Sequence, residues 1–352
     1  MPQLDELLLA VQEVFKEDKT LNKNKMLMKL NARFFDGNHN NMIDRSGVEA
    51  LIPEDASREI IQGIPKYSAV MQLATKAPNM SRKQRRVPVL STLPTAYFVD
   101  GDTGLKQTSE QAWGNKYFNA EELAVIVPIP EAVLDDADYD IWAEVKPRIM
   151  EAMGIAFDRA VLFGENAPAS WPKDILASAT EAGKVVTLGT GKDLYDDLLG
   201  EDGVISMVEE CGYMATGHVG AMKMRGKYRS LRADDGQPIF KSSVQGASSY
   251  ELDGSPIFFP ENGSMDPTKA LQFSGNFKQI VYAMRQDITY KILDQAVIQD
   301  STGKIIYNLA QQDMVALRAV MRLAWQVPNP INRLDPNEET RYPIAVLKPA
   351  TV

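Results

Sequence analysis

The stretch of residues 87–164 decides the fold, and its last part, residues 141–164, has the sequence IWAEVKPRIMEAMGIAFDRAVLFG. Apolar residues recur there every three or four positions, which is the spacing of a helix with one buried face. The terminal glycine supplies a stop signal, and Asp138 or Asp140 can cap the start. The pattern predicts a helix of about 22 residues, roughly 33 Å long, which Pro147 in its second turn can bend.

A long polar hairpin is predicted just before this helix, over about residues 95–128. Apolar and polar residues alternate at its two ends, with apolar residues at Ala96, Phe98, Val125 and Val127. Its middle, residues 101–119, has almost no core-forming side chains. Because a two-stranded ribbon is marginally stable alone, this one needs a surface to lie on.

Composition bounds the class of protein. At 352 residues the chain exceeds what one core usually serves, so two or more subdomains are expected. Its 44% hydrophobic and 24% charged residues are typical of a soluble globular protein. No apolar run reaches the roughly 18 residues of a membrane span, and the N-terminus lacks the features of a secretion signal. Cys211 is the only cysteine, which excludes an intrachain disulfide and a cysteine-cluster zinc site.

Charge is unevenly spread along the chain. Residues 1–90 carry 14 Lys and Arg against 11 Asp and Glu, whereas the remainder carries 24 against 36. Residues 60–99 contain no acid and include the basic cluster Arg82, Lys83, Arg85 and Arg86. Such a cluster can bind phosphates, or it can form an arm that is solvated or bridges subunits. The arm is favoured, because no aromatic residues interleave with the cluster and the bulk of the chain is acidic.

The other segments give a coarse order of elements. Amphipathic or short helices are predicted at residues 4–15 and 53–62, and prolines favour an extended chain over residues 65–94. A compact α/β subdomain is expected over 173–277. Period-two alternation predicts a strand over residues 315–327, and residues 288–307 are expected to form two strands around the turn Asp300-Ser301-Thr302-Gly303.

Two motifs resemble catalytic loops without meeting their requirements. Gly189-Thr190-Gly191-Lys192 suggests a phosphate loop, but that loop needs Gly where Val186 stands and Ser or Thr where Asp193 stands. Ser301-Thr302-Gly303-Lys304 matches a Ser-x-x-Lys pattern, but it lies in the predicted hairpin turn and not at the start of a buried helix.

Metal and acid–base chemistry find few candidates. His39 and His218 are the only histidines, and both are interpreted as ordinary surface or loop residues. The acidic run Asp135, Asp136, Asp138 and Asp140 lacks the glycine and terminal glutamate of a calcium loop, and a helix-start cluster explains it more simply. No catalytic residue, cofactor site or metal site is predicted. A pair of carboxylates for glycoside hydrolysis cannot be singled out among the 47 acids.

Several short segments follow one another in a distinctive order. They are RVPVL at 86–90, AYFV at 96–99, FNAEELAV at 118–125, IPEAVLDD at 129–136, FDRAVLFG at 157–164, LRADDGQPIF at 231–240, LDGSPI at 252–257, SGNF at 274–277 and QDMVALR at 312–318. In this order the chain resembles tailed-phage major capsid proteins of the Hong Kong 97 type.

The resemblance implies an α+β fold with four parts. They would be an N-terminal arm at 1–75, an extended loop at 95–127, a peripheral domain at 76–94, 128–185 and 278–335 with its spine helix at about 141–163, and an axial domain at 186–277 and 336–352. In this family the loop lies across a neighbouring subunit, which would give the polar hairpin its missing partner.

The function implied is assembly without catalysis. Copies of the chain would form pentamers and hexamers that close into an icosahedral shell around packaged double-stranded DNA, bound without sequence specificity. An acidic surface facing the lumen would let dense DNA move without sticking. Portal, scaffold and decoration proteins are possible partners, membranes are not, and the expected location is the virion capsid after assembly in the host cytoplasm. The first 50 residues are expected to clasp neighbours or to act as a removable scaffold-like segment.

Candidate intersubunit contacts follow from the loop and the arm. Trp113, Tyr117 and Phe118 are the expected apolar contacts, with packing inside the chain as the alternative. The basic contacts expected are Arg82, Lys83, Arg85 and Arg86. Some family members crosslink a loop lysine to a neighbour's asparagine, and Lys106 and Lys116 satisfy the lysine condition, although solvated lysines are common in any polar ribbon.

Two rival functions stay open. An encapsulin-like nanocompartment has the same fold and encloses an enzyme, and nucleic acid inside purified particles would discriminate against it. A soluble hydrolase is the other class, and the scarcity of histidine and of coherent motifs opposes it.

Overall fold

The structure is a computed structural model that describes residues 68–98, 106, 108–134, 141–232, 250–300 and 302–350. The helices predicted at 4–15 and 53–62 and the acidic run at 135–140 lie outside these ranges. The chain divides into two compact units. Unit 1 comprises Met1–Val48, Val127–Ile141 and Ile292–Leu317, and unit 2 comprises Glu49–Ile126, Trp142–Lys291 and Arg318–Val352.

Unit 1 contains a short hairpin on a small core. Strands β11 (Val297–Gln299) and β12 (Ile305–Asn308) pair antiparallel, and they are followed by the short helix η2 (Leu309–Gln311). The turn between them forms because Asp300 accepts hydrogen bonds from Thr302 and Lys304, while Gly303 has a φ of 83°. The predicted turn is therefore confirmed, but its first strand begins at Val297, since Ile288 belongs to a longer strand.

Small apolar clusters complete unit 1. Buried Leu309, Met314 and Ala316 pack with Ile298 and Tyr307 of the hairpin. Helix α5 (Glu131–Leu134) begins where the Glu131 N–H donates to the Asp313 carbonyl at 2.7 Å.

A four-stranded sheet runs through unit 2 in the order β1-β10-β13-β4. Its strands are β1 (Thr75–Lys76), β10 (Val281–Leu293), β13 (Met314–Gln326) and β4 (Glu121–Pro130), and the last three continue along the chain into unit 1. The strand predicted over residues 315–327 is confirmed as β13. One face of β13 is apolar and buried throughout, whereas the polar side chains Arg318, Arg322 and Gln326 all lie on the other face, which explains the period of two.

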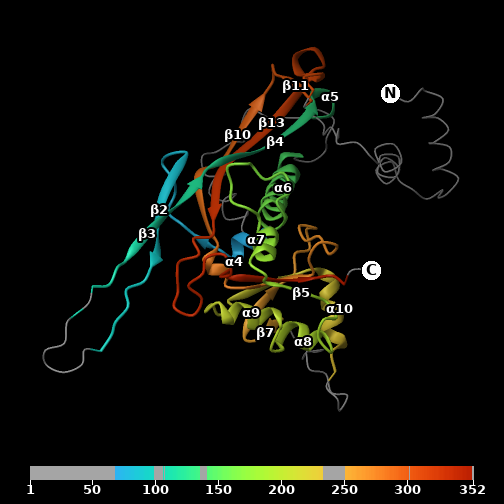
Figure 1. The fold of residues 1–352 in the computed structure, drawn as a ribbon. Coiled ribbons are helices and arrows are strands. Elements are labelled where there is room, and N and C mark those ends of the chain that lie inside the picture. The colour runs from blue at the N-terminus through green and yellow to red at the C-terminus, as the bar shows by residue number, and fades with distance from the viewer. Residues whose placement is uncertain are drawn as a thin grey trace. The chain divides into compact units, whose positions relative to one another are not determined.

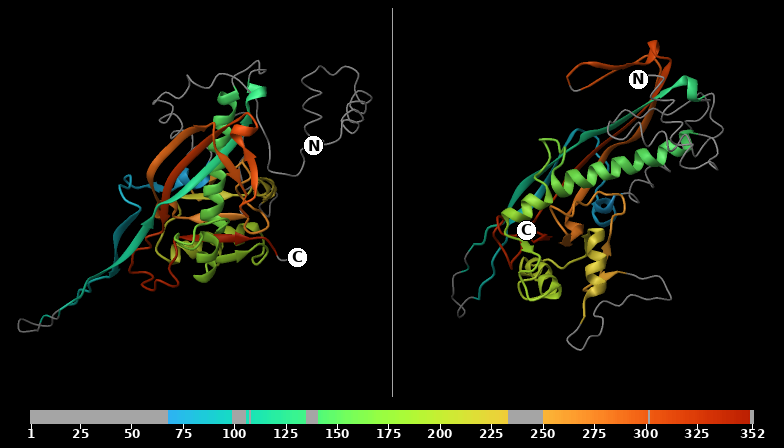
Figure 2. Two further views of the ribbon diagram at one scale, coloured as in Figure 1. Left: turned by 90° about the horizontal axis from the view of Figure 1, so that it is seen from above. Right: turned by 90° about the vertical axis from the view of Figure 1, so that its right-hand side faces the viewer.

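The long helix α6 (Ile141–Phe163) confirms the helix predicted from the opening stretch, with Pro147 inside it (Figure 2). Gly164 ends it with a φ of 69°, and its N–H donates to the Ala160 carbonyl at 3.1 Å. A side chain at Gly164 would also meet the Asp174 carboxylate at 2.8 Å. Glycine is therefore required there for its backbone angle and for space.

Unit 2 also contains a six-stranded sheet with its own core (Figure 1). Its strand order is β5-β14-β9-β6-β8-β7. The strands are β5 (Val185–Thr187), β14 (Ile344–Lys348), β9 (Gln272–Gly275), β6 (Gly217–Gly220), β8 (Ser255–Phe258) and β7 (Glu251–Leu252). The helices are α7 (Ile175–Glu181), α8 (Leu194–Leu199), α9 (Val204–Glu210), α10 (Met222–Ser230) and η1 (Phe277–Gln279). The expected α/β subdomain is confirmed.

The hairpin differs from its predicted bounds. The paired strands are β2 (Gln84–Thr92) and β3 (Ala112–Asn119), so the ribbon begins in the basic cluster and ends before Ala120. Val125 belongs to β4 in the four-stranded sheet. Prolines also do not exclude a helix from residues 65–94, because α4 (Ala69–Leu73) fits between them with Ser68 as its N-cap.

Candidate assembly surfaces

One face of the ribbon carries exposed apolar and aromatic side chains. Residues opposite each other on β2 and β3 share a face of the ribbon, and side chains alternate between faces along each strand. Trp113 is 63% exposed and Tyr117 is 44% exposed, although both belong to large residue types that usually seek burial. This exposed ribbon face consists of the cross-strand pairs Arg86–Tyr117, Pro88–Asn115 and Leu90–Trp113.

The opposite face of the ribbon is covered by its own chain. Phe118 is only 3% exposed and packs with Met80, Ala283 and Ala324. It follows Tyr117 in a strand, so its side chain points to the other side. The prediction of Phe118 as an intersubunit contact is therefore corrected: it makes the intrachain contact that was the alternative.

The segment after β13 holds the ribbon by hydrogen bonds to carbonyl groups of β2 and of the residues that follow it. The Ile331 N–H donates to the Leu90 carbonyl at 3.1 Å, and Arg333 donates to the Pro94 carbonyl at 2.6 Å. The buried guanidinium of Arg341 organises the segment by donating to Asn329 and to the Asp335 carbonyl. The ribbon is thus held to its own chain by Phe118 and by the backbone of β2, while the face with Trp113 and Tyr117 is open.

Two of the four predicted basic contacts interact with groups of their own chain, and the other two are exposed. Lys83 lies 3.4 Å from Glu121, and Arg85 donates to the Pro78 carbonyl at 3.2 Å. Arg82 and Arg86 are exposed, and neither has an ion-pair partner within the described part of the chain. Arg86 lies across from Tyr117 and so contributes a cation to the exposed ribbon face.

The two lysines proposed for crosslinking differ in their surroundings. Lys106 is exposed. Lys116 lies 2.6 Å from Glu338, and this ammonium group holds the pKa of the Glu338 carboxyl below its ordinary value. Lys116 therefore anchors the ribbon to the supporting segment in this structure.

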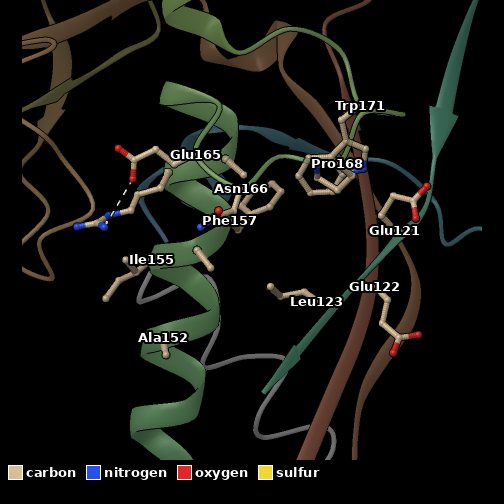
Figure 3. A pocket seen from close by; sticks show the side chains of 13 residues that line it. Glu121, Glu122, Leu123, Ala152, Ile155, Phe157, Glu165, Asn166, Pro168 and Trp171 are labelled. Carbon is tan, nitrogen blue, oxygen red and sulfur yellow. Dashed lines mark ion pairs between the residues drawn. The ribbon is translucent and has the colours of Figure 1, made fainter. Parts of the chain in front are cut away.

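A groove lies between α6 and the start of β4, with a volume of about 370 Å³ (Figure 3). Its apolar lining includes Leu123, Ile155, Phe157 and Trp171, and the Phe157 and Trp171 rings meet edge to face at 6.2 Å. The Trp171 indole N–H donates to the Asn119 carbonyl at 3.0 Å, which fixes the ring at the groove wall.

The carboxylates of the groove are already paired. Glu122 accepts two hydrogen bonds from Arg322, the shorter at 2.7 Å, and Glu165 lies 3.6 Å from Arg159. A hydrogen bond from Ser170, followed by the nearby Lys83, lowers the pKa of Glu121 below its ordinary value. A general acid needs a raised pKa. The groove thus suits packing against an apolar surface better than acid–base chemistry.

The remaining chemical candidates are occupied by structural contacts. The N–H groups of Gly189 and Gly191 donate to the buried Asp197 carboxylate at 2.7 Å each, so the phosphate-loop resemblance is a loop closed on its own acid. The prediction that His218 lies at the surface or in a loop is wrong. The residue is fully buried in β6, its Nε2 lies 3.1 Å from the Leu252 carbonyl oxygen, and burial lowers its pKa to about 4. His39 lies outside the described residues.

Within the described residues, no group of three or more His, Cys, Asp or Glu side chains is arranged to hold a metal ion. No helix in that part of the chain is both long enough and apolar enough to cross a membrane.

Sequence reasoning missed Asp158, which joins α4 to α6. Its buried carboxylate accepts hydrogen bonds from the Ser68 hydroxyl at 2.6 Å and from the N–H groups of Ala69 and Val70 at 2.8 and 3.2 Å. Burial raises its pKa to about 6 despite these donors. A signal existed: Asp158 stands one helical turn before Val161 and Leu162 on the buried side of α6.

Known proteins resemble this chain over most of its length. The model of the phage capsid family matches residues 49–332. The major capsid protein of Staphylococcus phage 80alpha is 26% identical over 312 residues, which cover 85% of this chain and 91% of that protein.

Two solved structures share the fold. A chain from Microbacterium phage Oxtober96 superposes with a TM-score of 0.70 at 34% identity, covering 80% of this chain and 91% of its own. A chain from Mycobacterium phage Adephagia gives 0.69 at 32% identity, with 81% and 91% covered.

Proposed function

The chain belongs to the phage capsid family, and we propose that it is the major capsid protein of a tailed phage. Its copies assemble as pentamers and hexamers into an icosahedral shell that encloses double-stranded DNA. This assignment rests on the family match and on relatives that cover most of the chain. Capsid proteins act by repeated contact with their own copies, so the chain's main partner is itself.

The exposed ribbon face is the observation that carries the proposal beyond the family. The ribbon contributes Phe118 to a shared core, yet it leaves Trp113 and Tyr117 in water. Aromatic residues supply much of the burial energy at protein interfaces. A ribbon anchored on one side with aromatic residues open on the other has the form of an intersubunit strap.

The four-part organisation of the family supports the same proposal. The six-stranded sheet draws its strands from residues that correspond to the proposed axial domain, and α6 corresponds to the spine helix of the peripheral domain. Residues 1–75 remain the proposed N-terminal arm. The proposed further partners are portal, scaffold or decoration proteins, and DNA that is contacted without sequence specificity. Assembly is proposed to take place in the host cytoplasm, after which the chain is part of the virion.

Electron microscopy of the purified full chain tests the function. Closed shells or ring-shaped capsomers are expected, and a persistent monomer with measurable hydrolase turnover would contradict the proposal. Nucleic acid inside the particles supports a phage capsid, whereas an enclosed enzyme would favour an encapsulin-like compartment. Crosslinking through Lys106 or Lys116 stays a prediction: a denaturing gel of mature particles that shows only monomer-sized protein would exclude it.

A further inference from the structure

Charge changes sign abruptly between two consecutive segments of the six-stranded layer. Residues 193–213 contain seven Asp and Glu and no Lys or Arg. Residues 214–232 contain five Lys and Arg and no Asp or Glu. Such a separation on one compact layer produces two surfaces of opposite potential.

The basic surface is centred on α10. Met224 and Tyr228 hold this helix to the core, while Lys223, Arg229 and Arg232 are exposed. Within the described residues, none of the five cations has a carboxylate at ion-pair distance. The basic patch is Lys223, Arg225, Lys227, Arg229 and Arg232.

Arg225 shows how rigidly this patch is held. Its guanidinium lies 4.7 Å from the centre of the Tyr250 ring and donates to the Tyr250 hydroxyl at 2.8 Å. This cation is fixed by an aromatic contact and not by a charge partner. At Arg225 the patch therefore presents a cation in a fixed position.

The acidic surface surrounds α8 and α9. Glu201 and Asp202 stand exposed in the turn between these helices, and Glu209 is exposed near the end of α9. Asp197 is excluded from this surface because it is buried beneath the loop at Gly189. The acidic patch is Asp193, Asp196, Glu201, Asp202, Glu209 and Glu210.

The two patches lie over different strands of the same sheet. Helix α9 packs against β14 and β9, whereas α10 meets Phe259 after β8 through the Tyr228 ring at 6.3 Å. Figure 2 (right) shows α10 standing apart from α8 and α9. Side chains of all three helices belong to one buried cluster, so the spacing between the patches is fixed.

We propose that the basic patch of one copy docks against the acidic patch of the next copy around a capsomer ring. A twofold contact can also pair unlike patches, but it closes after two copies and cannot build a ring of five or six subunits. A head-to-tail contact instead pairs unlike charges and repeats around the ring. This inference rests on the proposed function and names the contact that orients neighbouring subunits.

Nucleic acid is the other polyanion that a basic helix could meet. The acidic patch on the same layer carries at least as many charges as the basic patch and would repel a phosphate backbone that lay across the layer. In a ring, the two neighbours of each copy together satisfy both patches, whereas DNA satisfies only one.

Charge reversal in the full chain tests the docking. The first variant combines Lys223→Glu with Arg229→Glu, and the second combines Glu201→Lys with Asp202→Lys. The third carries all four changes. A control with Lys291→Glu and Lys304→Glu shifts the net charge as the first variant does, at exposed lysines outside the patches. Light scattering and electron microscopy give the protein concentration at which half of each variant is assembled, together with the salt dependence of assembly.

The first and second variants are expected to raise this concentration at least tenfold at about 0.1 M salt, where exposed charges still interact. The third variant should recover most of the loss, and the control should match the unmodified chain. Unchanged assembly in the first and second variants would overturn the inference and leave the proposed function standing. An equal loss in the control, or normal shells that hold less nucleic acid in the first variant, would also overturn it. An unmodified chain that stays monomeric at every concentration would overturn both proposals.

Discussion

The six-stranded layer and the β2–β3 ribbon solve the problem of burial in opposite ways. In the layer, helices α8, α9 and α10 bring their apolar side chains into one cluster that the chain closes by itself. In the ribbon, Phe118 is buried at the base while Trp113 and Tyr117 remain exposed. Residues of the same chemical type therefore have different surroundings: those of the layer hold the subunit together, and those of the exposed ribbon face are the ones proposed to contact a partner.

The largest effect is expected in the layer. Phe273 is fully buried in β9 and meets the Phe163 ring at 5.7 Å, so Phe273→Ala should lower the free energy of unfolding by about 3–5 kcal/mol. Phe98, which is fully exposed beyond the end of β2, provides the matched control. Phe98→Ala should change that free energy by less than about 0.5 kcal/mol in chemical denaturation. Similar losses in the two variants would remove the distinction between the regions.

The stability of the subunit should depend on pH through two buried groups, His218 and Asp158, that act in opposite directions. His218 has a folded pKa of about 4 against an ordinary 6.5, so its unfolded form binds a proton first and stability is lost as the pH falls from 6.5 toward 4. Asp158 has a folded pKa of about 6 against 3.8, so its folded form binds first and stability is gained as the pH falls from 6. Each contribution is about 3 kcal/mol at full extent.

Two variants separate these contributions between pH 6.5 and 5. Relative to the unmodified chain, His218→Gln should gain stability as the pH falls, because only the Asp158 contribution remains. Asp158→Asn should lose stability over the same range, because only the His218 contribution remains. Thermal melting at several pH values measures both slopes, and identical slopes in all three proteins would refute the assignment.

The exposed ribbon face should matter for assembly and not for the subunit. Trp113→Ala should leave the free energy of unfolding within about 0.5 kcal/mol of the unmodified value. It should raise the concentration needed for assembly about 30-fold, as expected when an interface loses a large aromatic anchor worth about 2 kcal/mol. Phe118→Ala is the neighbouring control and should do the reverse, reducing subunit stability first. A Trp113 variant that unfolds easily would place this side chain in the core.

The smallest effect is expected where the ribbon meets its support. Lys116 and Glu338 form an ion pair whose side chains are 35% and 64% exposed. Lys116→Ala should therefore cost less than about 1 kcal/mol, and this cost should shrink further in high salt. Denaturation at two salt concentrations measures it. A larger loss that persists in salt would mean that the ribbon is fixed mainly by this contact.

Local patterns predicted the parts of the fold that depend on neighbours in the sequence. Helix α6 followed from its apolar spacing and Gly164, and β13 followed from its period of two. The bounds of the ribbon did not follow, because the alternation at Val125 continues into a strand whose partner, β13, lies almost 200 residues later. Periodicity identifies a strand but not the strand that it pairs with.

The candidate surfaces were predicted in part for the same reason. Tyr117 and Phe118 are adjacent and similar, and only the tertiary position of Met80 and Ala324 decides which of the two is buried. His218 and Asp158 were missed because a polar residue in an apolar segment can be buried only where distant groups bond it, here Leu252 and Ser68.

The central claim is that the exposed ribbon face contacts a neighbouring subunit, and oxidative footprinting of Trp113 and Trp325 tests it most directly. Labelling is compared between unassembled subunits and purified shells, with the buried Trp325 as an internal reference that should label slowly in both. If a neighbouring subunit covers the exposed ribbon face, Trp113 should label readily in the unassembled subunit and become protected in the shell. Equal labelling of Trp113 in subunits and shells would contradict the account.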